Sequence, residues 1–136
     1  MRYERTVEVP ASADATWQVL QDLESWPTWT PTFQEVALLG PLEEGTKVRF
    51  KQPGRGEATY VVEALEPGRR FQWGSNGFGN EQHADHVVEP TGPGSCTVTL
   101  TFELTGFFAV GAGALYGRKI RGMVDTEAES LVSRLS

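Results

Sequence analysis

Residues 22–31 read Asp22-Leu23-Glu24-Ser25-Trp26-Pro27-Thr28-Trp29-Thr30-Pro31 and directly follow a short segment with helical periodicity. Each proline fixes φ and biases the residue before it toward extended geometry, so this stretch forms a stiff bend. Two tryptophans would expose a large apolar area if the bend lay free in solvent. We therefore expect the bend, here called the Trp-Pro elbow, to close over an apolar interior.

The segment before the elbow predicts a strand over 2–9 and a helix that Ser12 caps and that ends near Asp22. Pro10 ends the strand. Three apolar residues form one stripe of that helix at positions i, i+4 and i+7. They are Ala13, Trp17 and Leu20.

After the elbow, glycine- and proline-rich turns separate six further strand-like segments. These segments cover about 33–39, 46–52, 57–66, 69–75, 82–89 and 95–104. The last is the clearest, because apolar residues alternate strictly with threonine and glutamate, as in an antiparallel sheet with one packed face. Its inward residues are Cys96, Val98, Leu100, Phe102 and Leu104.

The last segment changes to a helical period. Apolar residues recur within one arc, and charged residues fall on the opposite side, so a long C-terminal helix is expected to lay one face on the concave side of the sheet. The arc contains Ile120, Met123, Val124, Ala128, Leu131 and Leu135. For residues 106–117, which are rich in glycine, the pattern leaves helix and loop open.

Composition limits the partners. The 136 residues fit one domain over 1–136, with no apolar run long enough to span a membrane and no apolar leader at the start. Cys96 is the only cysteine, which excludes an internal disulfide and favours a cytoplasmic location. The net charge of −6 argues against nucleic acid or an anionic membrane surface as a partner. A monomer or a homodimer is expected.

The Trp-Pro elbow, Pro10-Ala11 and Thr16-Trp17 resemble the START-like (SRPBCC) superfamily, in its polyketide cyclase/dehydrase and lipid transport branch. The resemblance implies an α+β helix-grip (Bet v 1-like) fold. In that fold a curved antiparallel sheet of about seven strands wraps around a long C-terminal helix, and two short helices follow the first strand. A ligand cavity between the sheet and the helix is implied as well.

In this family the strand before a proline reads approximately His-x-Phe-x-Leu-x-Pro, and its first, third and fifth residues face the helix. Counting back from Pro90, this chain departs from the pattern, with Ala84 in place of histidine and His86 in place of the aromatic. His86 is thus expected inside and His83 outside. The same parity turns Val48, Phe50, Tyr60, Val62, Phe71 and Trp73 inward.

The glycines near the start of the last helix share a face with Tyr116 and Ile120. Gly113 and Gly117 either keep the helix thin so that a ligand fits beside it, allow close packing on the sheet, or mark a frayed helix start. With the inward strand positions, they complete the candidate ligand-binding residues: Trp29, Phe50, Tyr60, Phe71, Trp73, His86, Phe102, Gly113, Tyr116 and Gly117.

His86 is the candidate acid/base group, because imidazole exchanges protons near neutral pH, and Tyr60 is a second candidate catalytic group. The alternative is a core histidine that is hydrogen-bonded to Tyr60 or to a backbone carbonyl. No metal site is expected, because His83 and His86 face opposite sides of their strand. No cofactor is expected, and no pair of carboxylates falls at inward positions.

Two functions follow. The first is binding of an apolar or aromatic small molecule, polyketide- or lipid-like, in the cavity between sheet and helix. The alternative is a polyketide cyclase or aromatase-type enzyme that catalyses aldol cyclisation or dehydration with His86 as acid/base. The scarcity of inward acid/base groups favours binding. A protein-interaction role, as in other branches of the superfamily, has no basic or patch-like feature in its support.

Overall fold

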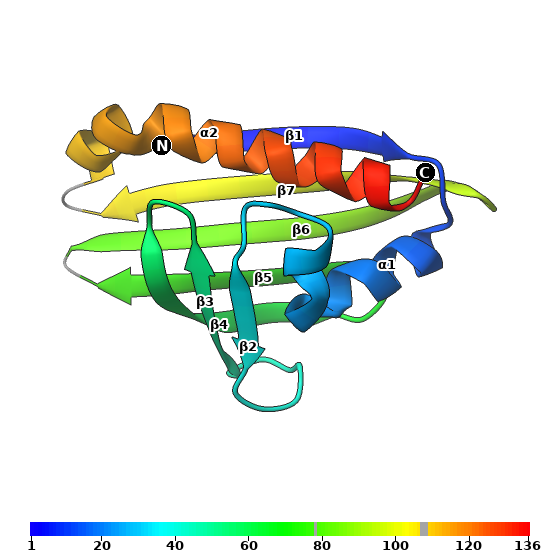
Figure 1. The fold of residues 1–136 in the computed structure, drawn as a ribbon, viewed down its shortest axis with the longest axis horizontal. Helices are drawn as coiled ribbons and strands as arrows, with labels where there is room; N and C mark the ends of the chain where they lie inside the picture. The colour runs from blue at the N-terminus through cyan, green and yellow to red at the C-terminus, as the bar shows by residue number, and fades with distance from the viewer. Residues whose placement is uncertain (78, 107–108) are drawn as a thin grey trace.

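The computed structural model describes residues 1–77, 79–106 and 109–136. One antiparallel sheet contains seven strands in the order β1-β7-β6-β5-β4-β3-β2, and the long helix α2 lies along it beside β1 and β7 (Figure 1). The elements in chain order are β1 (Arg2–Val9), α1 (Ala13–Gln21), the 3₁₀ helix η1 (Leu23–Thr28), β2 (Glu35–Leu38), β3 (Lys47–Gln52), β4 (Gly56–Glu66), β5 (Arg70–Gly77), β6 (Asn80–Gly92), β7 (Ser95–Gly106) and α2 (Ala109–Arg134). The predicted helix-grip fold is confirmed.

The two short helices follow β1 for local reasons. The Ser12 hydroxyl accepts a hydrogen bond from the Ala15 amide at 3.0 Å and caps α1, as the sequence predicts. The Trp-Pro elbow forms η1, in which Leu23 and Trp26 are completely buried. The elbow is therefore a helical turn whose apolar side packs into the interior.

Strand alternation sets the inward face of the sheet. In β7 the five predicted inward residues are all buried, and β7 pairs with β1 on one side and β6 on the other. On β6, His86 and Val88 are buried in the same interior. Strand β6 continues through Pro90 to Gly92, beyond its predicted end, with a register shift between Pro90 and Gly92.

Helix α2 begins at Ala109, so residues 109–117 are helical, while residues 107–108 lie outside the described residues. The inward side of α2 carries four fully or almost fully buried apolar residues. These are Ile120, Val124, Ala128 and Leu131, which all belong to the predicted arc. Within the described parts of the chain, no helix combines the length and apolarity needed to cross a bilayer.

Trp26 is the centre of an aromatic cluster between the sheet and η1. Its ring centroid lies 5.2 Å from that of Phe33, 5.4 Å from Trp73 and 5.5 Å from His86. Its indole N–H donates to the Leu20 carbonyl at 3.0 Å, so the one polar atom of this buried side chain is satisfied. The cluster fills one end of the space between the layers.

Candidate functional site: a cavity between the sheet and α2

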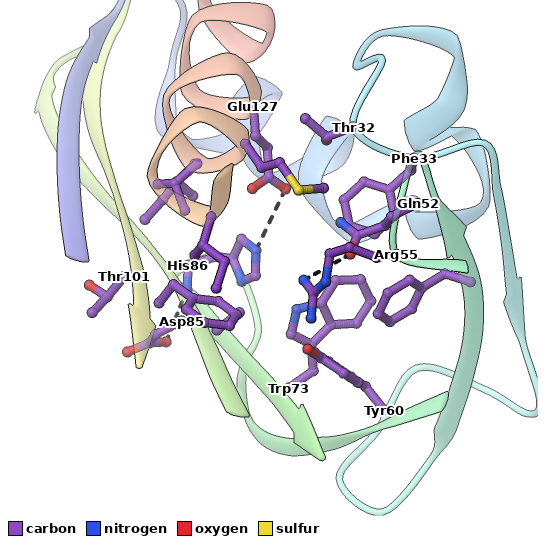
Figure 2. Close-up of a pocket in the computed structure, with 17 residues that line it drawn as sticks. Thr32, Phe33, Gln52, Arg55, Tyr60, Trp73, Asp85, His86, Thr101 and Glu127 are labelled. Atoms are coloured by element: carbon purple, nitrogen blue, oxygen red, sulfur yellow. Dashed lines mark hydrogen bonds and ion pairs between the residues drawn. The ribbon is translucent and has the colours of Figure 1, made fainter. Parts of the chain in front are cut away.

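A cavity of about 50 Å³ remains between the sheet and α2. Aromatic side chains from β3, β4 and β5 form one wall, β6 and β7 the next, and α2 the roof (Figure 2). Drug-sized ligands occupy cavities of roughly 300–1,000 Å³. A cavity site for water needs only about 10–15 Å³ by this measure, so the present volume accommodates water but not a polyketide.

His86 enters the cavity from β6. Its side chain is stacked on Phe71, with ring centroids 4.0 Å apart and an interplanar angle of 8°. Its Nδ1 lies 3.2 Å from the Phe71 carbonyl oxygen. Since a carbonyl only accepts, Nδ1 carries the proton and Nε2 presents its lone pair on the other side of the ring. Of the two hydrogen-bond partners considered for a core histidine, the backbone carbonyl is the one observed.

Glu127 faces His86 from α2. Its Oε1 lies 3.9 Å from His86 Nε2 (Figure 2). The Glu127 side chain is 13% exposed, and Oε1 has no hydrogen-bond partner among the described residues. Burial raises the pKa of Glu127 to about 8 and lowers the pKa of His86 to about 4. At pH 7 both groups are therefore neutral, with a carboxyl O–H facing an imidazole lone pair.

The distance between these groups defines what they can do. A separation of 3.9 Å exceeds a direct hydrogen bond, for which about 2.7–3.2 Å is usual. A ligand oxygen near both groups supplies a hydrogen-bond partner for each of them. A carbonyl oxygen accepts from the Glu127 carboxyl, and a hydroxyl accepts from it and also donates to His86 Nε2. The pair therefore fits a neutral oxygen of a bound molecule.

A second polar group lies at the other end of the cavity. The Tyr60 hydroxyl donates to Gln82 Oε1 at 2.5 Å, and Arg55 Nη2 donates to the same oxygen at 2.8 Å. Arg55 Nη1 donates to Gln52 Oε1 at 3.1 Å. Burial raises the pKa of the Tyr60 phenol, which remains a neutral donor at pH 7. Gln82 thus orients both the phenol and the guanidinium.

Half of the predicted ligand-binding residues line the cavity, namely Phe50, Tyr60, Trp73, His86 and Phe102. Trp29 and Phe71 do not contact the cavity. Phe71 is completely buried beneath the His86 ring, and Trp29 packs on Trp26 at 5.5 Å between ring centroids. Both lie behind side chains that contact the cavity or its aromatic cluster, Phe71 behind His86 and Trp29 behind Trp26.

The predicted ligand-binding residues at the start of α2 also lie outside this cavity. A Cβ on Gly113 would lie 3.3 Å from the Met1 side chain, and one on Gly117 would lie 3.5 Å from Met1 Sδ. These glycines therefore provide close packing of α2 on the N-terminal strand, one of the alternatives left open. Tyr116 is 57% exposed and lines a separate hollow nearer the surface.

Sequence reasoning missed Glu127, Arg55 and Gln52 as cavity residues. For Glu127 the signal was present, since it lies seven residues after Ile120 and four before Leu131, within the apolar arc. For Gln52, the parity of β3 places it on the inward face with Val48 and Phe50. Arg55 lies in a turn, where no periodicity indicates the direction of a side chain.

On the outer face of the sheet, His83 is directed away from the cavity as predicted. Its Nδ1 lies 2.7 Å from Glu63 Oε1, and this contact with a carboxylate raises the pKa of His83. Gly74 on the intervening strand leaves room for this contact, because a Cβ there would lie 2.4 Å from Glu63 Oε1. His83 therefore lies on the outer face of the sheet, whereas His86 lies in the cavity.

With this geometry established, comparison with known proteins identifies the family. The family model for polyketide cyclase / dehydrase and lipid transport matches residues 1–136. The chain belongs to this family. No curated protein shows significant sequence similarity to it.

Solved structures from several organisms share the fold. An aromatase/cyclase from Streptomyces is 17% identical with a TM-score of 0.78, and the match covers 99% of this chain and 93% of that one. A START superfamily protein from Mycobacterium smegmatis is 19% identical with a TM-score of 0.77, covering 98% and 96%. A norcoclaurine synthase mutant from Thalictrum flavum is 21% identical with a TM-score of 0.72, covering 100% and 96%.

Proposed function

We propose that this member of the polyketide cyclase/dehydrase and lipid transport family binds an apolar or aromatic small molecule with a neutral carbonyl or hydroxyl oxygen. The observation that carries the proposal is the facing pair of His86 and Glu127 inside an otherwise aromatic cavity. Glu127 Oε1 has no partner within the described chain, and burying such an atom unpaired costs about 1–3 kcal/mol. A ligand oxygen supplies the missing partner.

Binding requires the cavity to widen from about 50 Å³. Two of its residues are suited to move. Met123 is half-buried in α2, and an unbranched thioether side chain changes rotamer easily. Arg55 lies in the β3–β4 turn, where the described residues hold its guanidinium through the neutral amides of Gln52 and Gln82. Their displacement opens the cavity without disturbing the aromatic cluster around Trp26.

A titration with aromatic ketones and phenols, followed by tryptophan fluorescence, tests the proposal because Trp73 lines the cavity. The wild type should show saturable changes. Val124→Phe fills the cavity and should abolish them, whereas Val132→Phe, on the same helix outside the cavity, should not. Circular dichroism checks that both variants fold, since overpacking a core costs about 1–3 kcal/mol of stability. No saturable change in the wild type, or equal binding by Val124→Phe, would refute the proposal.

The same pair of residues favours one second candidate, catalysis of enolisation followed by aldol closure or dehydration. His86 Nε2 would take a proton from the carbon next to a ketone while the Glu127 carboxyl protonates the carbonyl oxygen, giving an enol and an imidazolium–carboxylate pair. The enol carbon would then attack a second carbonyl, forming a carbon–carbon bond, while the enol O–H returns its proton to the Glu127 carboxylate and the His86 imidazolium gives its proton to the new alkoxide oxygen, so that both residues regain their starting states. Burial weakens His86 as a base, however, and for this reason binding is the primary proposal.

Proton exchange distinguishes the two. With benzoylacetone in D₂O, a catalyst should accelerate deuterium incorporation at the central carbon, and both His86→Gln and Glu127→Gln should slow that exchange by about 10²–10⁴-fold. A protein that only binds should give the rate of the buffer alone, while fluorescence still reports binding.

A further inference from the structure

The second hollow, here called the vestibule, adjoins the cavity at the surface. Its volume is about 300 Å³, and Arg55 and Ile120 line both spaces. The polar residues that line it are Arg55, Asn80, Gln82, Tyr116 and Lys119. A molecule that enters the cavity beside Ile120 therefore leaves its outer end in the vestibule.

The vestibule is positively charged although the chain has a net charge of −6. Arg55 and Lys119 line it, and no carboxylate does so among the described residues. Neither cation forms an ion pair with an acidic side chain in the part of the chain that the structure describes. Two cations from separate elements thus face one hollow without an opposite charge.

Local contacts place both cations at the β3–β4 turn. The Gln82 amide oxygen accepts from Arg55 at 2.8 Å and from the Tyr60 hydroxyl, and Figure 2 shows the Arg55 guanidinium beside Tyr60 in the cavity. The Lys119 ammonium lies against the β3–β4 turn at Gly54, where a side chain would overlap it. Gly54 also has a φ of +73°, which glycine adopts without strain.

A third observation comes from Asn80, at the start of β6. Its Oδ1 is buried and has no hydrogen-bond partner within the described residues, and the side chain lines the vestibule. The amide group has one acceptor and two donors in nearly the same shape. In either orientation the Asn80 amide can form a hydrogen bond with an oxygen of a ligand. Its Oδ1 accepts from a hydroxyl, and its N–H donates to an anion.

We propose that the vestibule binds an anionic group, a carboxylate or a phosphate monoester, of a ligand whose apolar body lies in the cavity. Arg55 and Lys119 supply the charge, and Asn80 supplies a further hydrogen bond. Anionic oxygens accept from guanidinium more strongly than the amide oxygens that now hold Arg55, so the anion displaces Gln82 as its partner. The inference rests on the proposed binding function and restricts its ligands to amphipathic molecules.

The test uses aromatic probes that differ only in charge. 2-Naphthoate and 2-naphthamide have nearly the same shape, and 2-naphthyl phosphate compared with 2-naphthol examines the other anion. Affinities are measured by tryptophan fluorescence and calorimetry at 20 and 500 mM salt. Wild type should bind naphthoate at least about tenfold more tightly than naphthamide at low salt, and the difference should shrink at high salt. Tighter binding of the phosphate than of naphthoate would identify the phosphate monoester as the preferred group.

Variants assign the effect to the vestibule. Lys119→Gln should weaken naphthoate binding about 5–10-fold and leave naphthamide within about twofold, whereas Arg55→Gln, which also alters the cavity lining, should weaken naphthoate binding by more than it changes naphthamide binding. Arg118→Gln is the matched control, because it removes the same charge from an exposed neighbour that does not line the vestibule. It should leave both affinities unchanged.

The outcomes separate the two proposals. Binding of both probes with equal affinity would overturn the anion site and leave the cavity proposal intact. A loss with Arg118→Gln as large as that with Lys119→Gln would overturn the site as well, since the effect would then come from the general surface potential. Failure of every probe to bind would overturn both proposals.

Discussion

The ionisation of Glu127 predicts how stability depends on pH. Its pKa is raised by burial from the ordinary 4.5 to about 8, so the folded state holds a proton that the unfolded state has released. This contribution to stability is fully present below about pH 4.5 and is lost as the pH rises toward about 8. We therefore expect replacement of Glu127 by glutamine to flatten the decline on the alkaline side.

The magnitude follows from linkage. Each pH unit within this range changes the free energy of unfolding by 1.36 kcal/mol per proton, with some flattening near the pKa itself, which gives roughly 1.5–2 kcal/mol between pH 6.5 and 8. The linkage of His86 to stability falls mainly below this region, between about pH 4 and 6.5, because burial lowers its pKa from 6.5 to about 4. Its contribution cancels in the difference between wild type and Glu127→Gln, which both retain His86.

The measurement is urea unfolding followed by tryptophan fluorescence at four pH values from 6.5 to 8. Glu129→Gln is the control, because it removes the same formal charge from an exposed position of α2, 3.6 Å from Arg5. Stability of the wild type relative to Glu127→Gln should fall by roughly 1.5–2 kcal/mol over this range, and relative to Glu129→Gln it should stay nearly constant. A difference that stays flat, or that moves in favour of the wild type as the pH rises, would show that Glu127 is ionised and paired with His86, contrary to the reasoning.

Three further predictions concern single residues. His86→Gln should become more stable relative to the wild type by about 3 kcal/mol as the pH falls from 6.5 to 4, because the depressed pKa of His86 makes the wild type lose stability in that range; parallel unfolding curves would contradict this. Gly117→Leu should lower stability by about 1–3 kcal/mol, because its branched side chain overfills the space beside Arg121 and Met1, and it should leave naphthamide binding unchanged; lost binding in a stable variant would return this glycine to the cavity. Gly122→Ala should raise the melting temperature, with a gain of about 0.5–1 kcal/mol, because a Cβ there meets nothing within 4 Å in the interior of α2; a lower melting temperature would indicate a contact that the structure lacks.

The sequence predicted the layers well because burial is periodic. The alternation in β7 and the apolar arc of α2 each extend over many residues, so a single exception does not change the predicted element or its buried face. The inward direction of His86 followed from parity counted from Pro90. The same approach could not distinguish Phe71, behind the cavity wall, from Trp73, on the wall itself. Strand alternation predicts which face of the sheet a side chain lies on, but it does not predict whether that side chain reaches the cavity.

The end of the cavity was less predictable for another physical reason. Gly113 and Gly117 lie on the inward side of α2, yet what they meet is Met1, which depends on where β1 begins relative to the helix. Arg55 reaches the cavity from a turn and owes its direction to hydrogen bonds with Gln52 and Gln82. Contacts of this kind join residues distant in sequence, and no local pattern reports them.

Glu127 shows where function can be found in such patterns. A carboxyl group on the apolar face of α2 opposes a histidine on the inward face of β6. Burial shifts the pKa of Glu127 from 4.5 to about 8, a change that corresponds to about 5 kcal/mol against ionisation. A leucine at position 127 would fill the same arc without that penalty and without an unpaired oxygen. The pair therefore carries a cost that an apolar residue at position 127 would avoid, and this cost supports the proposal that the two groups hold an oxygen of a ligand between them.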